Sequence, residues 1–271
     1  MTHVTVLVTL LNDKRVTRTL DSLEAQTRKP DAVLVADGGS TDGTLDALNA
    51  YPWARVEHHP GTVAGTRSSA LASLRGTDVV VFLDSDQVAP PGWLAALVAP
   101  IEAGRADFTG GPTRPLVAPR GKGEAYLNDF EAWFYPNVVA HDLTKLPMGN
   151  SAWKLDTMRS AGGFDARLAW GGEDYDLNLR MHALGARGEY VPDAWVHHDQ
   201  GGRNDLRRLL RRKYRYNVGA TMAYLKNGVL RQKMRGAARN TIAFRHPYER
   251  WNLLIQPAAL VAGWWKWRRV Q

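Results

Sequence analysis

Residues 78–86 read DVVVFLDSD, in which five consecutive apolar residues lead directly into two acids separated by one serine. An unbroken apolar run of this length is typical of a strand that is buried on both faces of a parallel sheet. Upstream, Val4–Leu10, Ala32–Ala36 and Arg55–Glu57 are further expected strands, with helical segments between them. This alternation predicts an α/β fold, in which helices flank a mixed, mostly parallel sheet with a Rossmann-like nucleotide-binding half.

The expected helices lie between these strands and beyond them. Their apolar spacing or N-terminal residues favour the segments Arg15–Gln26, Thr44–Ala50, Ala64–Leu74, Pro90–Ala103, Glu124–Phe134, Glu173–Leu184 and Leu206–Asn227. Two segments rich in glycine, Gly38–Gly43 and Gly110–Gly123, are expected loops. Tyr190–Val196 is expected to be one more strand.

Charge is distributed unevenly along the chain, whose net charge is +8. Residues 1–200 contain 18 Lys and Arg against 25 Asp and Glu, whereas residues 201–271 contain 17 against 2. We therefore expect a catalytic domain at 1–200, with halves at 1–112 and 113–200, and a basic helical extension at 201–271. Such a basic segment favours phosphate-bearing partners: nucleic acid, an anionic membrane face or a phosphorylated substrate.

The chain contains no cysteine, which excludes disulfides and thiolate metal sites. Any metal ion must therefore be held by carboxylates, imidazoles or ligand oxygens. The first eleven residues lack the basic start of a secretory signal. We expect a cytoplasmic protein, either free or at the inner face of the membrane.

Polar side chains follow several of the expected strands. Asn12, Asp37 and Asp84 each come directly after one, and the carboxyl ends of parallel strands meet at one edge of a sheet, so all three are expected to face one crevice. Asp84 and Asp86, on either side of Ser85, can converge on a hard cation such as Mg²⁺ or Mn²⁺ that bridges to a diphosphate. The alternative is a polar turn that caps the next helix.

The segment Trp170–Asp174 reads WGGED and opens the expected helix Glu173–Leu184. Its glycines allow the backbone to approach a ligand closely. A carboxylate at this position could take a proton from an acceptor hydroxyl. The alternative is that the acids only complement the positive end of the helix dipole.

Three other features are ambiguous on their own. His197 and His198 follow an expected strand, where an imidazole can complete a metal shell or serve the structure alone. Asp37 lies in a glycine-rich turn and can accept hydrogen bonds from a base or ribose. Arg67 can reach a phosphate or lie in solvent.

The order and spacing of these features resemble the family 2 glycosyltransferases of the GT-A fold, over roughly residues 4–198. The matching segments are Thr9–Asn12 (TLLN), Asp37–Thr44 (DGGSTDGT), Ala64–Ser68 (AGTRS), Asp84–Asp86 (DSD), Gly149–Ala152 (GNSA), Gly162–Asp165 (GGFD), Gly172–Asp174 (GED) and Pro192–Ala194 (PDA) with His198. The usual proline of the first element is missing, and Gly38 replaces the second acid of the family's DDGS. Only Asp37 can therefore carry the nucleobase contact that the resemblance implies.

The resemblance implies a UDP- or GDP-linked sugar as the donor. The residues that would bind it are Thr9, Leu10, Leu11, Asn12, Asp37, Gly65, Arg67, Asp84 and Ser85. A Mn²⁺ or Mg²⁺ ion, held by Asp86 and His198 and also by Asp84, would neutralise the leaving diphosphate.

The resemblance also implies direct displacement with inversion at the anomeric carbon. Asp174 would deprotonate the acceptor hydroxyl, and Glu173 would bind or orient the acceptor. The residues implied on the acceptor side are Trp170, Gly171, Gly172 and Glu173. The acceptor itself stays open between a glycan, a lipid, a peptide and a small molecule.

The basic extension has two interpretations. Its helix Leu206–Asn227 either packs on the catalytic domain or contacts an anionic membrane or a phosphate-bearing acceptor. The segment Leu253–Trp267 contains Pro257 and is too short for a membrane span of about 20 residues. Its tryptophans suit peripheral membrane contact, packing on the core, or burial in a homodimer.

Two other classes of protein stay open as alternatives. Binding of nucleic acid would explain the basic extension and no other feature. The acids at 84–86 and 173–174 would repel the phosphates of a nucleic acid, so none is expected as a partner. A sugar nucleotidyltransferase has a similar sheet. Its glycine-rich, arginine-containing loop is absent after Leu10, where Leu11, Asn12 and Asp13 stand.

Overall fold

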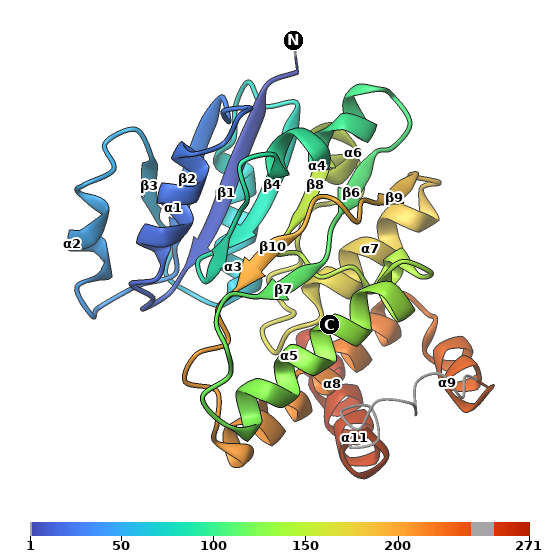
Figure 1. Ribbon diagram of the computed structural model, residues 1–271. Coiled ribbons are helices and arrows are strands. Elements are labelled where there is room, and N and C mark those ends of the chain that lie inside the picture. Colours follow the sequence, from blue (N-terminus) through green and yellow to red (C-terminus); the bar gives the residue numbers. More distant parts are fainter. Residues whose placement is uncertain (1, 240–251) are drawn as a thin grey trace.

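The computed structural model describes residues 2–239 and 252–271. In this part of the chain, the main sheet has seven strands in the order β3-β2-β1-β4-β8-β6-β9 (Figure 1). These are β1 (Val4–Leu10), β2 (Ala32–Asp37), β3 (Arg55–His58), β4 (Val79–Asp84), β6 (Phe108–Gly110), β8 (Ser151–Lys154) and β9 (Gly188–Tyr190). Strands β1 to β4 are parallel, whereas β8 is antiparallel to both β4 and β6. The expected mixed, mostly parallel sheet is therefore confirmed.

Helices cover both faces of this sheet (Figure 1). One face packs against α1 (Val16–Glu24) and α4 (Trp93–Glu102), the other against α3 (Val63–Ser73), α6 (Leu155–Ser160) and α7 (Glu173–Ala183).

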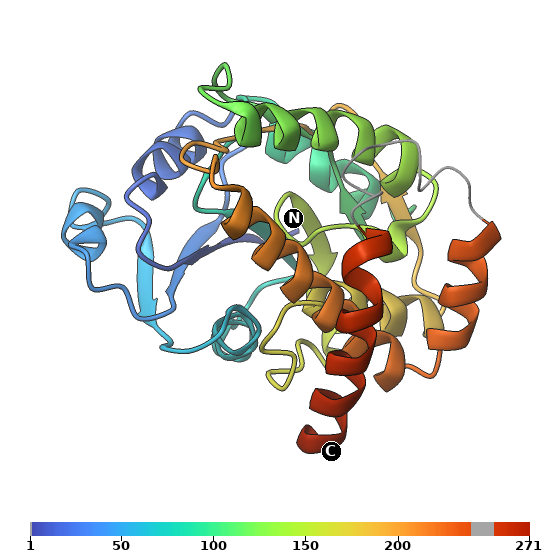
Figure 2. The same ribbon diagram turned by 90° about the horizontal axis from the view of Figure 1, so that it is seen from below.

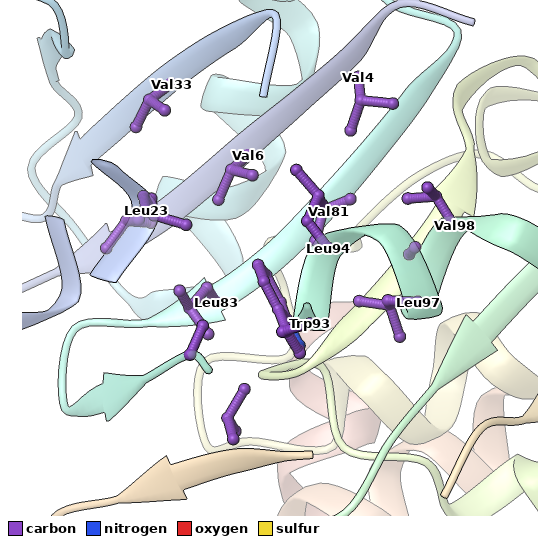
Figure 3. Packing of buried hydrophobic residues seen from close by; sticks show 14 of the residues in the cluster. Val4, Val6, Leu23, Val33, Val81, Leu83, Trp93, Leu94, Leu97 and Val98 are labelled. Atoms are coloured by element: carbon purple, nitrogen blue, oxygen red, sulfur yellow. The ribbon is translucent and has the colours of Figure 1, made fainter. Parts of the chain in front are cut away.

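Side chains of β1 alternate between the two faces, as the pleat of a strand requires. Val6 joins the cluster with Trp93 of α4 (Figure 3). Val8 belongs to the same cluster, and Leu7 joins the opposite one. Burying each such side chain stabilises the fold by ~1.5–3 kcal/mol. Two-sided burial therefore explains why Val79–Leu83 of β4 is continuously apolar and why β1 is apolar except at Thr5 and Thr9.

A second sheet of three short strands lies beside the carboxyl end of β4. It has the order β5 (Gln87–Val88), β10 (Val196–His198) and β7 (Thr113–Pro115). Within it, His198 is paired with Gln87 across antiparallel strands. This pairing brings a histidine from late in the chain next to the acids that follow β4.

The remaining helices are short or lie at the carboxyl edge of the sheet. They are α2 (Thr44–Leu48), α5 (Lys122–Phe134), the π-helical turn η1 (Tyr135–Val139), the 3₁₀ turn η2 (Leu143–Lys145), α8 (Leu206–Lys226), α9 (Leu230–Arg239) and α11 (Asn252–Val270).

The C-terminal helices α8 and α11 lie side by side and pack on the rest of the molecule (Figures 1 and 2). Val218 and Met222 of α8 form a buried cluster with Ala259 and Trp267 of α11 and with Leu168. The second half of α8 therefore packs on the rest of the molecule, as one of the two interpretations of the basic extension predicts. Within residues 2–239 and 252–271, every helix is too short or too polar to cross a bilayer.

Two expected elements were wrong. The expected loop Gly110–Gly123 contains the end of β6, all of β7 and the start of α5, because three-residue strands leave no readable periodicity. The expected strand Tyr190–Val196 is interrupted: β9 ends at Tyr190 and β10 begins at Val196. Pro192 lies in the turn between them and has no N–H to donate to a sheet.

Candidate active site

A cleft of about 1460 Å³ opens at the carboxyl ends of β1 and β4. It is lined by Asp84–Gln87, Gly171–Tyr175 and residues of α3, α5 and α8. Figure 2 shows α5 and α8 from this side of the molecule. The expected site residues that line the cleft are Thr9, Leu10, Leu11, Arg67, Asp84, Ser85, Asp86, Trp170, Gly171, Gly172, Glu173, Asp174 and His198.

Asp86 and His198 form the first polar centre of the cleft. Oδ2 of Asp86 is 3.3 Å from Nε2 of His198, and both side chains are about nine-tenths buried. Nδ1 of the same ring is 2.8 Å from Oε1 of Glu131 on α5. Burial disfavours the charged imidazole, but Glu131 and Asp86 outweigh it and raise the pKa of His198 to about 9.

Two arginines complete this centre. Nη2 of Arg203 donates to Oδ2 of Asp86 at 2.7 Å, and Nη1 of Arg203 lies 3.3 Å from Nε2 of His198. Nη2 of Arg15 lies 3.6 Å from the same carboxylate oxygen. Burial alone would raise the pKa of Asp86, but His198, Arg203 and Arg15 hold it well below its usual range.

The chemistry of this pair fits a hard divalent cation. The carboxylate oxygen of Asp86, in the turn between β4 and β5, and the imidazole nitrogen of His198 on β10 can share one Mn²⁺ or Mg²⁺ ion. In the described part of the chain, no three acidic or histidine side chains are arranged to hold a metal by themselves. A cation bound by Asp86 and His198 would thus need further oxygen ligands from a bound substrate. The guanidinium of Arg203, which contacts both side chains, would have to move away to make room for the cation.

Arg67 links the end of β4 to the start of α7. This buried arginine of α3 donates to Oδ1 of Asp84 at 3.0 Å and to Oε1 of Glu173 at 2.9 Å. Its Nε also donates to Oγ1 of Thr9 at 3.3 Å. One guanidinium therefore fixes groups from β1, β4 and α7 relative to each other. The carboxylate of Asp84 is turned to Arg67, not to the Asp86–His198 pair.

Glu173 and Asp174 form the second polar centre, at the N-terminus of α7. Burial, followed by repulsion from the Glu173 carboxylate, raises the pKa of Asp174 to about 7. Oδ1 of Asp174 accepts a hydrogen bond from the N–H of Tyr175 at 2.8 Å. A carboxyl with this pKa is suited to exchange a proton near neutral pH.

Two glycines allow close contacts around the cleft. Gly172 has φ +85°, and a Cβ there would lie 2.4 Å from the carbonyl carbon of Gly219 on α8. A Cβ on Gly149 would lie 2.2 Å from Oδ2 of Asp84. Only glycine allows these contacts, which explains two of the glycines in the motifs.

Three expected donor-site residues do not line the cleft: Asn12, Asp37 and Gly65. The carboxylate of Asp37 is fully buried and accepts hydrogen bonds from the N–H groups of Gly39 and Ser40, and it lies 2.7 Å from Nδ1 of His58. In the structure its role is to hold the glycine-rich turn, so its contact with a nucleobase stays a prediction.

Asn12 and Gly65 also have local roles. Oδ1 of Asn12, whose φ is +50°, accepts from the N–H of Thr41 at 2.8 Å, so it ties the end of β1 to the Asp37 turn. The N–H of Gly65 donates to Oγ1 of Thr62, the N-cap of α3, at 3.2 Å.

Four residues that complete the first centre were not predicted from the sequence: Arg15, Glu131, Gln200 and Arg203. Glu131 and Gln200 hydrogen-bond each other and His198, and Arg203 bonds both Asp86 and Gln200. Glu131 had no readable signal, because it is one of several acids on an amphipathic helix. Arg203 had a weak one, since it follows Gly201 and Gly202 a few residues after His198.

Comparisons with known proteins assign the family. The chain matches glycosyl transferase family 2 over residues 5–137 and glycosyl transferase family group 2 over residues 79–267. A pre-mycofactocin glycosyltransferase of Mycobacterium tuberculosis is 31% identical over 85% of this chain and 46% of its own length. A validoxylamine A glucosyltransferase of Streptomyces hygroscopicus is 29% identical over 70% of this chain and 50% of its own length. The chain thus spans about half the length of these two curated relatives.

One relative matches over most of its length. An N-acetylglucosaminyl-diphospho-decaprenol L-rhamnosyltransferase of Mycobacterium tuberculosis is 29% identical over 89% of this chain and 90% of its own length.

Solved structures show the same fold. GalNAc-T7 with UDP, GalNAc and Mn²⁺ superposes with a TM-score of 0.61 at 16% identity, over 83% of this chain and 48% of that one. TarS of S. aureus superposes with a TM-score of 0.56 at 20% identity, over 83% and 40%. The family match over residues 79–267 and this fold lead to one conclusion: the chain belongs to glycosyltransferase family 2 and has the GT-A fold.

Proposed function

We propose that the protein transfers a hexose-type sugar from a nucleoside-diphosphate donor, UDP- or GDP-linked, to a hydroxyl of an acceptor, with inversion at the anomeric carbon. The observation that carries this proposal is the presence of two polar centres, Asp86 with His198 and Glu173 with Asp174, in one cleft. Relatives named as a glucosyltransferase and a rhamnosyltransferase support the reaction class. Because they differ in substrate, the acceptor stays open between a glycan, a lipid, a peptide and a small molecule.

Asp86 and His198 are the proposed ligands of a divalent cation, Mn²⁺ or Mg²⁺. When bound, such an ion would neutralise the negative charge of the leaving diphosphate. Asp84 is a weaker candidate ligand, since its carboxylate pairs with Arg67. The Mn²⁺ in the GalNAc-T7 structure supports a metal in this fold and does not fix its ligands here.

Asp174 is the proposed general base. A pKa near 7 leaves a large fraction of Asp174 ionised at neutral pH and still makes it basic enough to accept the acceptor's proton. Direct displacement then inverts the anomeric carbon, because the acceptor oxygen attacks the face opposite the diphosphate. Glu173, held by Arg67, would orient the acceptor beside Trp170, Gly171 and Gly172.

A screen of nucleotide sugars for thermal stabilisation tests the donor class. We expect one UDP- or GDP-linked sugar to raise the melting temperature with Mn²⁺ or Mg²⁺ present and to lose this effect with a chelator. Stabilisation by no nucleotide sugar, or release of pyrophosphate in place of a nucleoside diphosphate during turnover, would count against the proposal. The second result would favour a sugar nucleotidyltransferase.

Peripheral membrane contact at the cytoplasmic face is the proposed location. It is supported by the exposed side chains of Val261, Trp264 and Trp265 on α11, next to Arg268 and Arg269. Exposed tryptophans beside arginines suit a lipid interface. Sedimentation with anionic vesicles that is lost in Trp264→Ala/Trp265→Ala would support this location. A concentration-dependent dimer that is lost in the same variant would point to a homodimer interface.

A further inference from the structure

The first half of α8 presents a basic surface to the cleft. It contributes the cleft-lining residues Arg208, Arg211, Arg212, Lys213 and Arg215. After its N-cap, Asp205, the helix contains no acid. This basic surface takes no part in the two polar centres described above.

Two of the three acids of the facing helix α5, Glu124 and Glu131, are engaged elsewhere, and the third, Asp129, is exposed and does not line the cleft. Glu131 binds Thr113 and His198, and Glu124 accepts from the N–H groups of Arg120 and Gly202. Both are therefore fixed in local contacts.

Two arginines on α8 have few carboxylates of the described residues near them. Arg208 reaches Asp205 only at 3.6 Å, and its side chain is 84% exposed. Among the described residues, no carboxylate lies within 4.0 Å of the Arg211 guanidinium. The charge of Arg208 is thus offset only by one exposed ion pair with Asp205, and that of Arg211 by no carboxylate of the described residues.

The position of these arginines relates them to the acceptor side. Gly219 of α8 packs on Gly171, since a Cβ on Gly219 would lie 2.1 Å from the Gly171 carbonyl oxygen. From Arg211 to Gly219 an α-helix rises about 12 Å. The charge therefore lies about two turns along the cleft wall from the start of α7, which carries Asp174.

We propose that the acceptor bears a phosphate or diphosphate group, which Arg208 and Arg211 bind while a hydroxyl of the same molecule faces Asp174. This inference rests on the proposed function and names the acceptor class. Guanidinium groups bind phosphate oxygens through paired charge-assisted hydrogen bonds. Phe130 and Trp133 of α5 line the same cleft and supply apolar surface for the neutral part of the acceptor.

Hexyl phosphate is a suitable probe, with hexanol as the neutral control. Its binding is measured by titration calorimetry with Mg²⁺ and a saturating nucleoside diphosphate, UDP or GDP, so that the donor site is filled. We expect saturable binding of hexyl phosphate, none of hexanol, and a loss of affinity of about tenfold or more in Arg208→Glu/Arg211→Glu. Added salt should weaken the binding, because both guanidinium groups are exposed.

A matched control variant is Lys29→Glu/Arg75→Glu. It makes the same change in net charge at exposed residues that do not line the cleft, and it should bind hexyl phosphate like the wild type. Equal binding by all three proteins would overturn the proposal. Displacement of hexyl phosphate by the nucleoside diphosphate would also overturn it, because the arginines would then serve the donor.

A second arm separates a soluble acceptor from a lipid surface. If Arg208→Glu/Arg211→Glu abolishes sedimentation with phosphatidylglycerol vesicles while hexyl phosphate shows no saturable binding to the wild type, the surface recognises a membrane and the proposal fails. Failure of the donor chemistry is distinguishable. It would appear as absence of Mg²⁺-dependent nucleoside diphosphate binding in the wild type, whereas the α8 variant should keep that binding.

Discussion

The guanidinium of Arg203 lies 2.7 Å from the carboxylate of Asp86, on the side that also faces His198. A protein cation thus occupies the place where the proposed metal ion would bind its carboxylate. Arg203 follows Gly201 and Gly202, and its side chain is 23% exposed, so it has room to move away.

Replacement of this arginine should therefore favour the metal. We expect Arg203→Ala to bind Mn²⁺ more tightly than the wild type in the absence of nucleotide, by about tenfold, because one charge-assisted contact no longer competes. Titration of free Mn²⁺ by electron paramagnetic resonance measures this affinity. Arg203→Lys is the matched control, which keeps the charge and should show a smaller change. Weaker Mn²⁺ binding by Arg203→Ala would mean that the arginine supports the metal site.

Loss of the proposed base should reduce the rate and spare the fold. Asp174→Asn keeps the shape of the side chain but cannot accept a proton, so we expect turnover to fall by about 10²–10⁴-fold. A coupled assay for nucleoside diphosphate release measures the rate. A turnover within a few-fold of the wild type would remove Asp174 from this role.

The pH dependence of the rate should reflect the raised pKa of Asp174. Because the base must be ionised, kcat/KM should rise with pH and level off above about 7, the pKa of Asp174. Glu173→Gln removes the neighbouring negative charge that helps to raise this pKa, so its profile should shift to lower pH. An unchanged profile in that variant would contradict the coupling of the two carboxyls.

The contact between α7 and α8 should be sensitive to a single methyl group. Gly172→Ala adds a Cβ 2.4 Å from the Gly219 carbonyl carbon at φ +85°, which we expect to lower the free energy of unfolding by about 2–4 kcal/mol. Gly76→Ala is the control, because its φ is +63° and no atom lies within 4 Å of its Cβ. Urea denaturation compares the two, and equal losses would mean that backbone strain alone matters.

The sequence predicted most of the sheet because its central strands are buried on both faces. The run Val79–Leu83 is apolar for that reason, and Asp84 and Asp86 mark where β4 leaves the core. The cleft side of the fold was less predictable. β7 has three residues and ends in Pro115, and its pairing with β10 is a long-range contact that no local pattern records.

The site residues also divide into those that a local sequence pattern marks and those that only the tertiary fold brings in. Some site residues belong to motifs whose order along the chain is recognisable, and the structure brings them into one cleft: Asp86, Glu173, Asp174 and His198. Glu131 reaches the site because α5 packs beside β7, the neighbour of β10 in the second sheet, and this packing depends on the tertiary fold. Asp37 differs from Glu131 because its motif is recognisable in the sequence. Its carboxylate, however, accepts hydrogen bonds from the N–H groups of Gly39 and Ser40 in its own turn.

The most direct test of the account separates the two polar centres in one measurement. Calorimetric titration with a nucleoside diphosphate, UDP or GDP, in the presence of Mn²⁺ compares the wild type with Asp86→Ala and Asp174→Asn. We expect Asp86→Ala to lose the metal-dependent binding and Asp174→Asn to keep it. Equal binding by wild type and Asp86→Ala would contradict this expectation, because the diphosphate would then not depend on a cation at this carboxylate.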